Sequence, residues 1–141
     1  MKMFDNFGLS LALLAVVSLS ACQPATTLAV ADVCPAVTGE IWYKIKVALP
    51  NDATIHVRLE EQGIADVVAE VIGETKILSD GQQVPIAFSL PPDCTILKKA
   101  AMPGFTVRIE DNKGTLMFIN DAHFPLVPNG GANRIEVVKV Q

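Results

Sequence analysis

Residues 105–120, FTVRIEDNKGTLMFIN, give the clearest indication of the fold. Phe105, Val107 and Ile109 alternate with polar residues, which is the pattern of a strand with one face in the core. The next four residues, Asp-Asn-Lys-Gly, have the composition of a turn, and an apolar stretch follows them. The sequence therefore predicts a β-hairpin here.

Two earlier stretches show the same alternation. In residues 38–47 and 54–59 every second residue is apolar, so each range is predicted to be a half-buried strand. The inward-facing residues would be Ile41, Tyr43, Ile45 and Val47 in the first strand, and Ile55, Val57 and Leu59 in the second.

Three further strands complete the pattern. Residues 67–78 are rich in β-branched side chains, which favours a bent or bulged strand. In residues 84–90, Pro85 removes a ladder donor and favours an edge or strand-start position. Residues 134–140 form the last predicted strand, and their alternation slips at Val137-Val138, which suggests a bulge.

About seven strands separated by turns, with one short helical turn in residues 95–101, predict an all-β protein. The expected architecture is a single-domain antiparallel β-sandwich over residues 38–141. The formal net charge of −4 argues against nucleic acid as a partner.

The start of the chain has the features of an export signal. Lys2 precedes an apolar run that is too short to span a bilayer, and Leu19-Ser20-Ala21-Cys22 resembles the lipobox of bacterial lipoproteins. We expect a signal peptide over 1–21, a lipid on Cys22 and a tether over 22–37. The alternative is an ordinary secretory signal with a chance cysteine. Gln23 after the lipidated cysteine favours the periplasm-facing outer membrane of a Gram-negative bacterium.

Two cysteines remain once Cys22 carries lipid. An even pair in an oxidising compartment predicts a disulfide between Cys34 and Cys94. The alternatives are two free thiols or half of a metal site, and a zinc site would require a further cysteine or a nearby histidine.

The sequence offers no arrangement typical of an enzyme, a metal site or a cofactor site. His56 lies between polar residues on an exposed strand face, and His123 has Asp121 near it without a nucleophile motif. The acidic pairs at 60–61 and 110–111 lie at strand ends, where charges are easily solvated. We therefore predict a non-enzyme with no catalytic residue, no metal and no cofactor beyond the covalent lipid.

A binding surface is the better functional candidate. Trp42, Lys44 and Lys46 share the outward side of the first strand, so they are the candidate contact for a peptide or a sugar. Alternatively, the tether, a neighbouring strand or the loop near Phe124 covers Trp42. An edge strand, either the Pro85 strand or the last one, is a second candidate, because it can pair with a partner's extended segment.

Three short motifs behind the lipobox resemble the YbaY-like lipoproteins: residues 39–43 (GEIWY), 48–53 (ALPNDA) and 88–91 (FSLP). That family is similar to the YscW-type lipoprotein chaperones, or pilotins, of type III secretion, and the resemblance covers about residues 39–140. It implies an outer-membrane lipoprotein with a β-sandwich domain that helps a secretin or another envelope assembly. The alternative is an envelope lipoprotein that binds a periplasmic ligand such as a glycan, a lysozyme or a protease.

Overall fold

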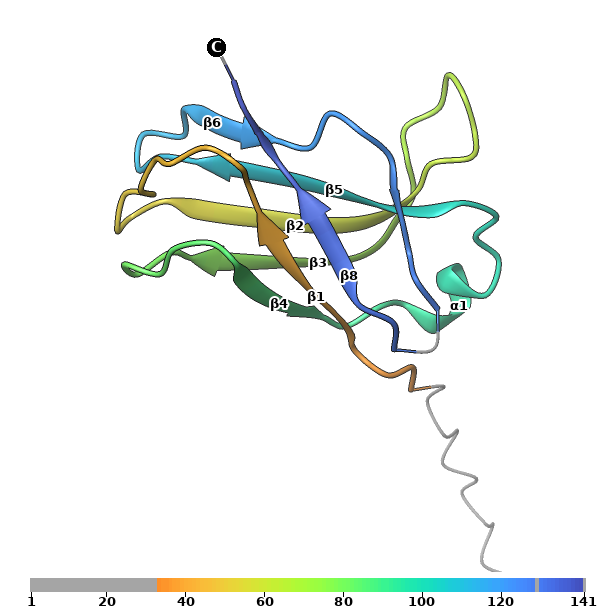
Figure 1. The fold of residues 1–141 in the computed structure, drawn as a ribbon. Coiled ribbons are helices and arrows are strands. Elements are labelled where there is room, and N and C mark those ends of the chain that lie inside the picture. Colours follow the sequence, from red (N-terminus) through yellow and green to blue (C-terminus); the bar gives the residue numbers. More distant parts are fainter. Residues whose placement is uncertain (1–32, 129, 141) are drawn as a thin grey trace, which may run out of the picture.

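The computed structural model describes residues 33–128 and 130–140 of the chain (Figure 1). The predicted signal peptide, the lipid on Cys22 and the first part of the tether lie outside these residues.

The described residues form nine strands and one short helix in two sheets. One sheet has the order β4-β1-β8 and the other β3-β2-β5-β6-β9, with β7 paired to β5. The bounds are β1 Val37–Trp42, β2 Thr54–Glu61, β3 Val71–Leu78, β4 Ile86–Leu90, α1 Cys94–Leu97, β5 Pro103–Glu110, β6 Leu116–Ile119, β7 Phe124–Pro125, β8 Asn133–Glu136 and β9 Val138–Lys139. The prediction of an all-β sandwich is confirmed.

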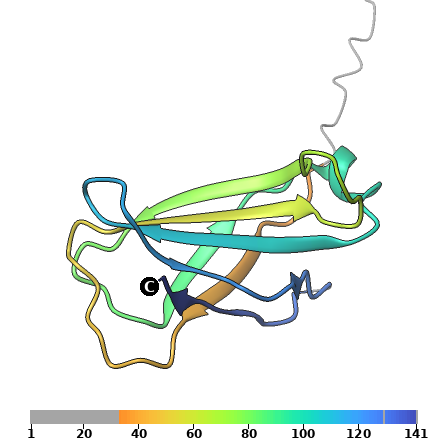
Figure 2. The same cartoon turned by 90° about the horizontal axis from the view of Figure 1, so that it is seen from above.

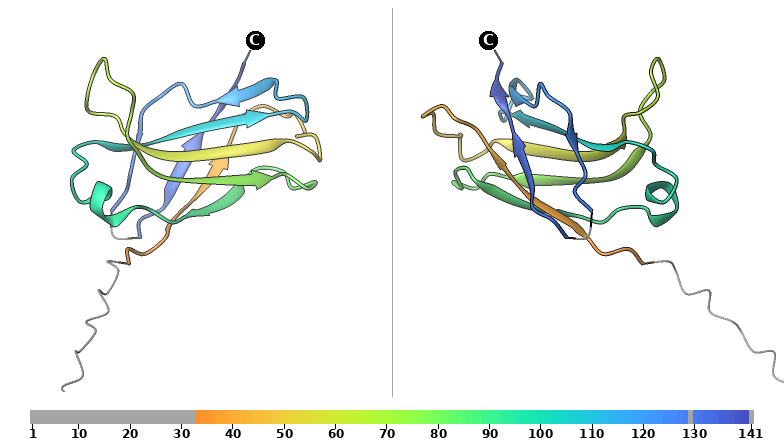
Figure 3. Two further views of the ribbon diagram at one scale, coloured as in Figure 1. Left: turned by 180° about the vertical axis from the view of Figure 1, so that it is seen from behind. Right: turned by 45° about the vertical axis from the view of Figure 1, so that its right-hand side comes forward.

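The two sheets bury the faces that the alternation predicts. β1 and β8 lie across the face of the long strands β2, β3 and β5 (Figures 1 and 3). Side chains of both sheets meet between them, and Phe88 packs edge-on against Phe105 with 5.6 Å between ring centroids. The fully buried residues include Ile41, Ile55, Val57, Leu59, Phe105, Val107, Ile109, Phe118 and Ile135. The hairpin at 105–120 is also confirmed, because β5 pairs with β6 in antiparallel register.

The first strand is shorter than predicted. β1 ends at Trp42, and Ile45 and Val47 are 42% and 41% exposed in the loop that follows. The reason is that the pairing with β4 ends at Ile41 and the pairing with β8 ends at Trp42, so the chain leaves the sheet there. β1 and β8 are parallel, unlike the antiparallel arrangement predicted for the sandwich.

The last strand passes from one sheet to the other. β8 pairs with β1, whereas β9 pairs with β6, and the buried Val137 between them donates its N–H to the Trp42 carbonyl at 2.9 Å. The slip in alternation at Val137 therefore marks a change of sheet, and the prediction of a bulge within one strand is wrong.

Three other regions bear on the prediction. Residues 67–70 belong to a loop, since β3 begins only at Val71. Pro85 directly precedes β4, which is an edge strand, so both positions predicted for this proline agree with the structure. The predicted helical turn is α1, which Asp93 caps by accepting hydrogen bonds from the N–H groups of Thr95 (2.8 Å) and Ile96 (3.1 Å).

Glu61 is a buried carboxylate where a solvated strand end was expected. It ends β2 on the inward side and is 8% exposed. The Met102 N–H donates to both carboxylate oxygens at 3.1 Å, and the Gly63 N–H donates to Oε1 at 2.6 Å. These hydrogen bonds, that of Met102 foremost, hold the pKa of the Glu61 carboxyl below its ordinary value even though burial acts to raise it.

A lowered pKa in the folded state makes Glu61 stabilising at neutral pH. The contribution is complete above the ordinary glutamate pKa of about 4.3 and is lost as the pH falls through the lower value of the folded state. We predict that Glu61→Gln has a lower urea midpoint of unfolding than the wild type at pH 6. The difference between the two midpoints should be smaller at pH 3. Urea unfolding at both pH values measures this, and an equal difference at both would contradict it.

Candidate functional site

The predicted contact residues lie at the end of β1 and in the loop that follows it, with Trp42 on the outer face of the three-stranded sheet. Trp42 is half-buried, with the Arg134 guanidinium carbon 4.6 Å and the Lys44 Nζ 5.5 Å from its ring centroid. We call this group, completed by Glu40 and Glu136, the Trp42 patch. Arg134, which lies over the indole, belongs to the neighbouring strand β8. Of the three segments considered as covering Trp42, namely the tether, a neighbouring strand and the loop near Phe124, the structure thus shows the neighbouring strand.

Both cations of the Trp42 patch already have anionic partners. Arg134 Nε lies 2.8 Å from a Glu40 oxygen, and Lys44 Nζ lies 2.8 Å from a Glu136 oxygen. Lys46 is exposed in the loop after β1. The structure thus brings together Trp42 and Lys44 of the three predicted residues, in a patch whose charges balance.

The histidines have neighbours other than those expected of a catalytic centre. His56 lies on the outer face of β2, with its Nε2 3.7 Å from a Glu110 oxygen, at a shallow polar hollow of about 390 Å³. His123 Nδ1 lies 2.6 Å from Oε1 of Gln62, so its neighbour is this amide and not Asp121. Gln62 donates in turn to the Thr106 hydroxyl at 3.3 Å. Neither arrangement places a nucleophile beside a base.

The described part of the chain has neither a metal-binding cluster nor a membrane-spanning helix. Residues 33–128 and 130–140 contain no group of three or more His, Cys, Asp or Glu side chains placed to hold a metal ion. Within the same residues, no helix is long and apolar enough to cross a bilayer.

A largely apolar groove of about 480 Å³ lies beside the first described residues. Its walls come from three parts of the chain that are distant in sequence, namely the start of β1, the end of α1 and the loop before β8. They are Cys34, Pro35, Ala36, Val37, Thr38, Leu97, Leu126, Val127, Pro128, Gly130, Gly131 and Asn133. The sequence analysis did not identify this groove.

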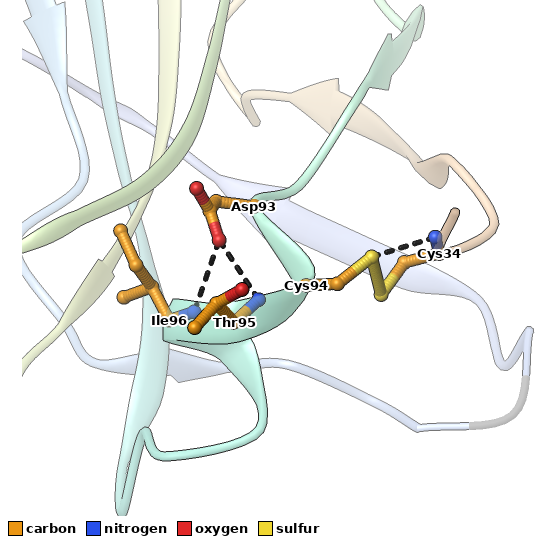
Figure 4. Close-up of a disulfide and its surroundings, with 5 residues drawn as sticks. All are labelled: Cys34, Asp93, Cys94, Thr95 and Ile96. Carbon is orange, nitrogen blue, oxygen red and sulfur yellow. Dashed lines mark hydrogen bonds between the residues drawn. A yellow bond between two sulfur atoms is a disulfide. The ribbon is translucent and has the colours of Figure 1, made fainter. Parts of the chain in front are cut away.

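A disulfide fixes one wall of the groove. Cys34 and Cys94 are bonded, with 5.5 Å between their Cα atoms, and the Cys34 N–H also donates to the Cys94 sulfur at 2.7 Å (Figure 4). Because Cys94 opens α1, the bridge ties the segment before β1 to the helix that carries Leu97.

A buried asparagine fixes the opposite wall. Asn133 is 5% exposed, accepts a hydrogen bond from the Val127 N–H at 2.9 Å and donates to the Thr38 carbonyl at 2.8 Å. A side chain at Gly131 would collide with Val127. The loop therefore packs closely against the start of β1, and the groove is built into the fold.

Comparisons with known proteins agree with this architecture. The model of the YscW family, described as type III secretion system lipoprotein chaperone, matches residues 33–138. The uncharacterized lipoprotein YbaY of Escherichia coli strain K12 is 32% identical over an alignment of 115 residues, and the match covers 76% of this chain and 56% of YbaY. The chain thus spans little more than half the length of that relative.

A solved structure is similar over most of the domain. It is that of an alternative pilotin from the type II secretion system of Vibrio cholerae, with a TM-score of 0.68 and 29% sequence identity. The match covers 76% of this chain and 97% of the pilotin chain. The resemblance read from the short motifs is confirmed, and the chain belongs to the YscW family of lipoprotein chaperones.

Proposed function

We propose that this chain is an outer-membrane lipoprotein, anchored by lipid on Cys22, that acts as a pilotin-like chaperone for a secretin or another envelope assembly. The proposed organisation is a signal peptide over 1–21, a lipidated tether over 22–37 and a β-sandwich over 38–141. The likeness to a type II secretion pilotin over 97% of that pilotin's length is the observation that carries the proposal.

The groove is the proposed binding site for the partner. It is largely apolar and opens beside Cys34, twelve residues after the proposed lipid anchor at Cys22. Binding there would remove an apolar segment of a secretin subunit from water, which is favourable. The bound segment would be unable to associate with other secretin subunits until assembly. Since the groove lies close to the anchored end, the partner would be held near the membrane.

The Trp42 patch, together with the exposed Lys46, remains a second proposed contact. Its ion pairs lie in solvent, where each contributes little to stability, so a partner's charges can replace them at low cost. The indole offers an amphipathic surface of the kind enriched at protein interfaces.

A cross-linked pull-down tests the proposed role. The tagged full chain is recovered from its native envelope under conditions in which a secretin is expressed, beside a Cys22→Ser control. We expect mass spectrometry to find the secretin subunit with the wild type, and we expect deletion of the gene to remove that subunit from the outer membrane. Recovery without the secretin would contradict the chaperone role, whereas equal membrane attachment of Cys22→Ser would contradict the lipid anchor alone.

Val127→Asp tests the groove. Val127 is 42% exposed in the groove wall, so the substitution should leave the fold intact while placing an unpaired charge where the partner's apolar segment binds. We predict at least about a tenfold loss in affinity for the secretin subunit, or roughly 1.4 kcal/mol. Leu78→Asp is the control, because Leu78 is also exposed (58%) and lies outside both the groove and the Trp42 patch. Equal affinities of the two variants would contradict the assignment.

Trp42→Ala tests the second contact. If the partner also covers the patch, removal of the indole should weaken capture by roughly tenfold. The same affinity measurement applies, with circular dichroism to verify the fold. Unchanged capture would remove the Trp42 patch from the interface and leave the groove as the binding site.

A further inference from the structure

The loop between β2 and β3 exposes apolar side chains. Ile64, Val67 and Val68 are 65%, 61% and 96% exposed, and Met102 beside them is 50% exposed. The loop and Met102 are close in space, because the Gln62 N–H donates to the Met102 carbonyl at 3.1 Å. We call these four apolar residues the end patch.

Buried hydrogen bonds hold the loop at its base. The Glu61 carboxylate accepts from the N–H groups of Gly63 and Met102, and the Glu61 N–H donates to the Glu70 carbonyl at 2.9 Å. Both ends of the loop and the segment before β5 are therefore joined through one residue. The apolar side chains thus project from a loop whose base is fixed.

The end patch lies at the end of the sandwich from which the chain leads to Cys22. Viewed from above, the loop and α1 lie at the same end of the molecule (Figure 2). α1 is bonded through Cys94 to Cys34, twelve residues after Cys22. Even a fully extended connection of this length reaches only about 40 Å. A lipid on Cys22 would keep this end of the domain close to the bilayer.

Charges of both signs lie at this end: Asp66 and Glu70 are exposed in the loop, and the cations that suit a lipid surface come from the end of α1. Lys98 and Lys99 are exposed at the end of α1, a few residues before Met102. Apolar side chains next to lysines are typical of surfaces that lie in the interfacial layer of a membrane, where the ammonium groups meet phosphate. Four side chains alone bind such a layer weakly, but the anchor raises their effective concentration at the surface.

We propose that the end patch contacts the membrane to which the chain is anchored, with the apolar loop in the interfacial layer and Lys98 and Lys99 against the phosphates. The contact orients the sandwich relative to the bilayer. This inference rests on the proposed lipid anchor and not on the identity of the protein partner.

Quenching by brominated lipids tests the proposal. Trp42 is the single tryptophan of the chain, so Trp42→Phe provides a background in which Val68→Trp or Leu78→Trp introduces the sole tryptophan. Leu78 is 58% exposed at the far end of β3 and is the matched control. The lipidated full chain is placed in vesicles of phosphatidylethanolamine and phosphatidylglycerol that contain brominated acyl chains.

We expect the emission of the Val68→Trp variant to fall at least about twofold in these vesicles, as for a side chain in the interfacial layer, and that of Leu78→Trp to stay unchanged. Flotation with the vesicles reports the anchor separately. A chain that floats but whose Val68→Trp emission is not quenched, or is quenched only as much as that of Leu78→Trp, overturns the membrane contact and leaves the anchor intact. A chain that does not float overturns both. If the Val68→Trp emission is not quenched by the brominated lipids but changes when a secretin subunit is added, the loop belongs to the contact with the protein partner instead.

Discussion

The C-terminal segment is the constraint on which the rest of the structure depends. β8 pairs with β1 in one sheet and β9 pairs with β6 in the other, so residues 133–139 belong to both layers. Val137 lies at the crossing and donates its N–H to the Trp42 carbonyl. The same segment contributes to the groove and to the Trp42 patch. Arg134 and Glu136 belong to the Trp42 patch, and Asn133 holds the groove wall. A lesion in this segment would therefore damage the core and the binding surfaces together.

The disulfide is the second constraint, and it acts on the entrance of the chain into the domain. It closes a loop of 60 residues, which on the chain-entropy model corresponds to roughly 4 kcal/mol of stabilisation. Its place matters as much as its energy. By joining the segment before β1 to α1, it ties together the start of the domain, the helix and one wall of the groove.

Local patterns predicted the strands whose partners are also regular. β2 and β5 follow the predicted alternation because each is paired along its length. The exposure of Ile45 and Val47 was not predictable, since it depends on where β8, ninety residues later, leaves the sheet.

Glu61 was predictable in principle, because it continues the inward side of Ile55, Val57 and Leu59. The groove was not, as its walls are brought together by the disulfide, the pairing of β1 with β8 and the side chain of Asn133, which join residues far apart in the sequence. Trp42 and Lys44 were correctly placed together, but the sequence could not reveal that Arg134 and two carboxylates complete their surroundings.

Charged and apolar surfaces occupy different parts of the sandwich. Ion pairs occupy the outer faces of both sheets: Arg58 with Glu74 and Arg108 with Glu110 on one, and Arg134 with Glu40 and Lys44 with Glu136 on the other. Charged faces of this kind resist association with other sheets. The apolar groove and the end patch lie beside α1 and in loops, away from the middle of either sheet. Both are therefore close to the end of the domain from which the chain leads to Cys22. In the proposed role, an anchored chaperone would benefit from apolar surfaces at that end, because a partner held there would have the shortest path from the groove to the bilayer.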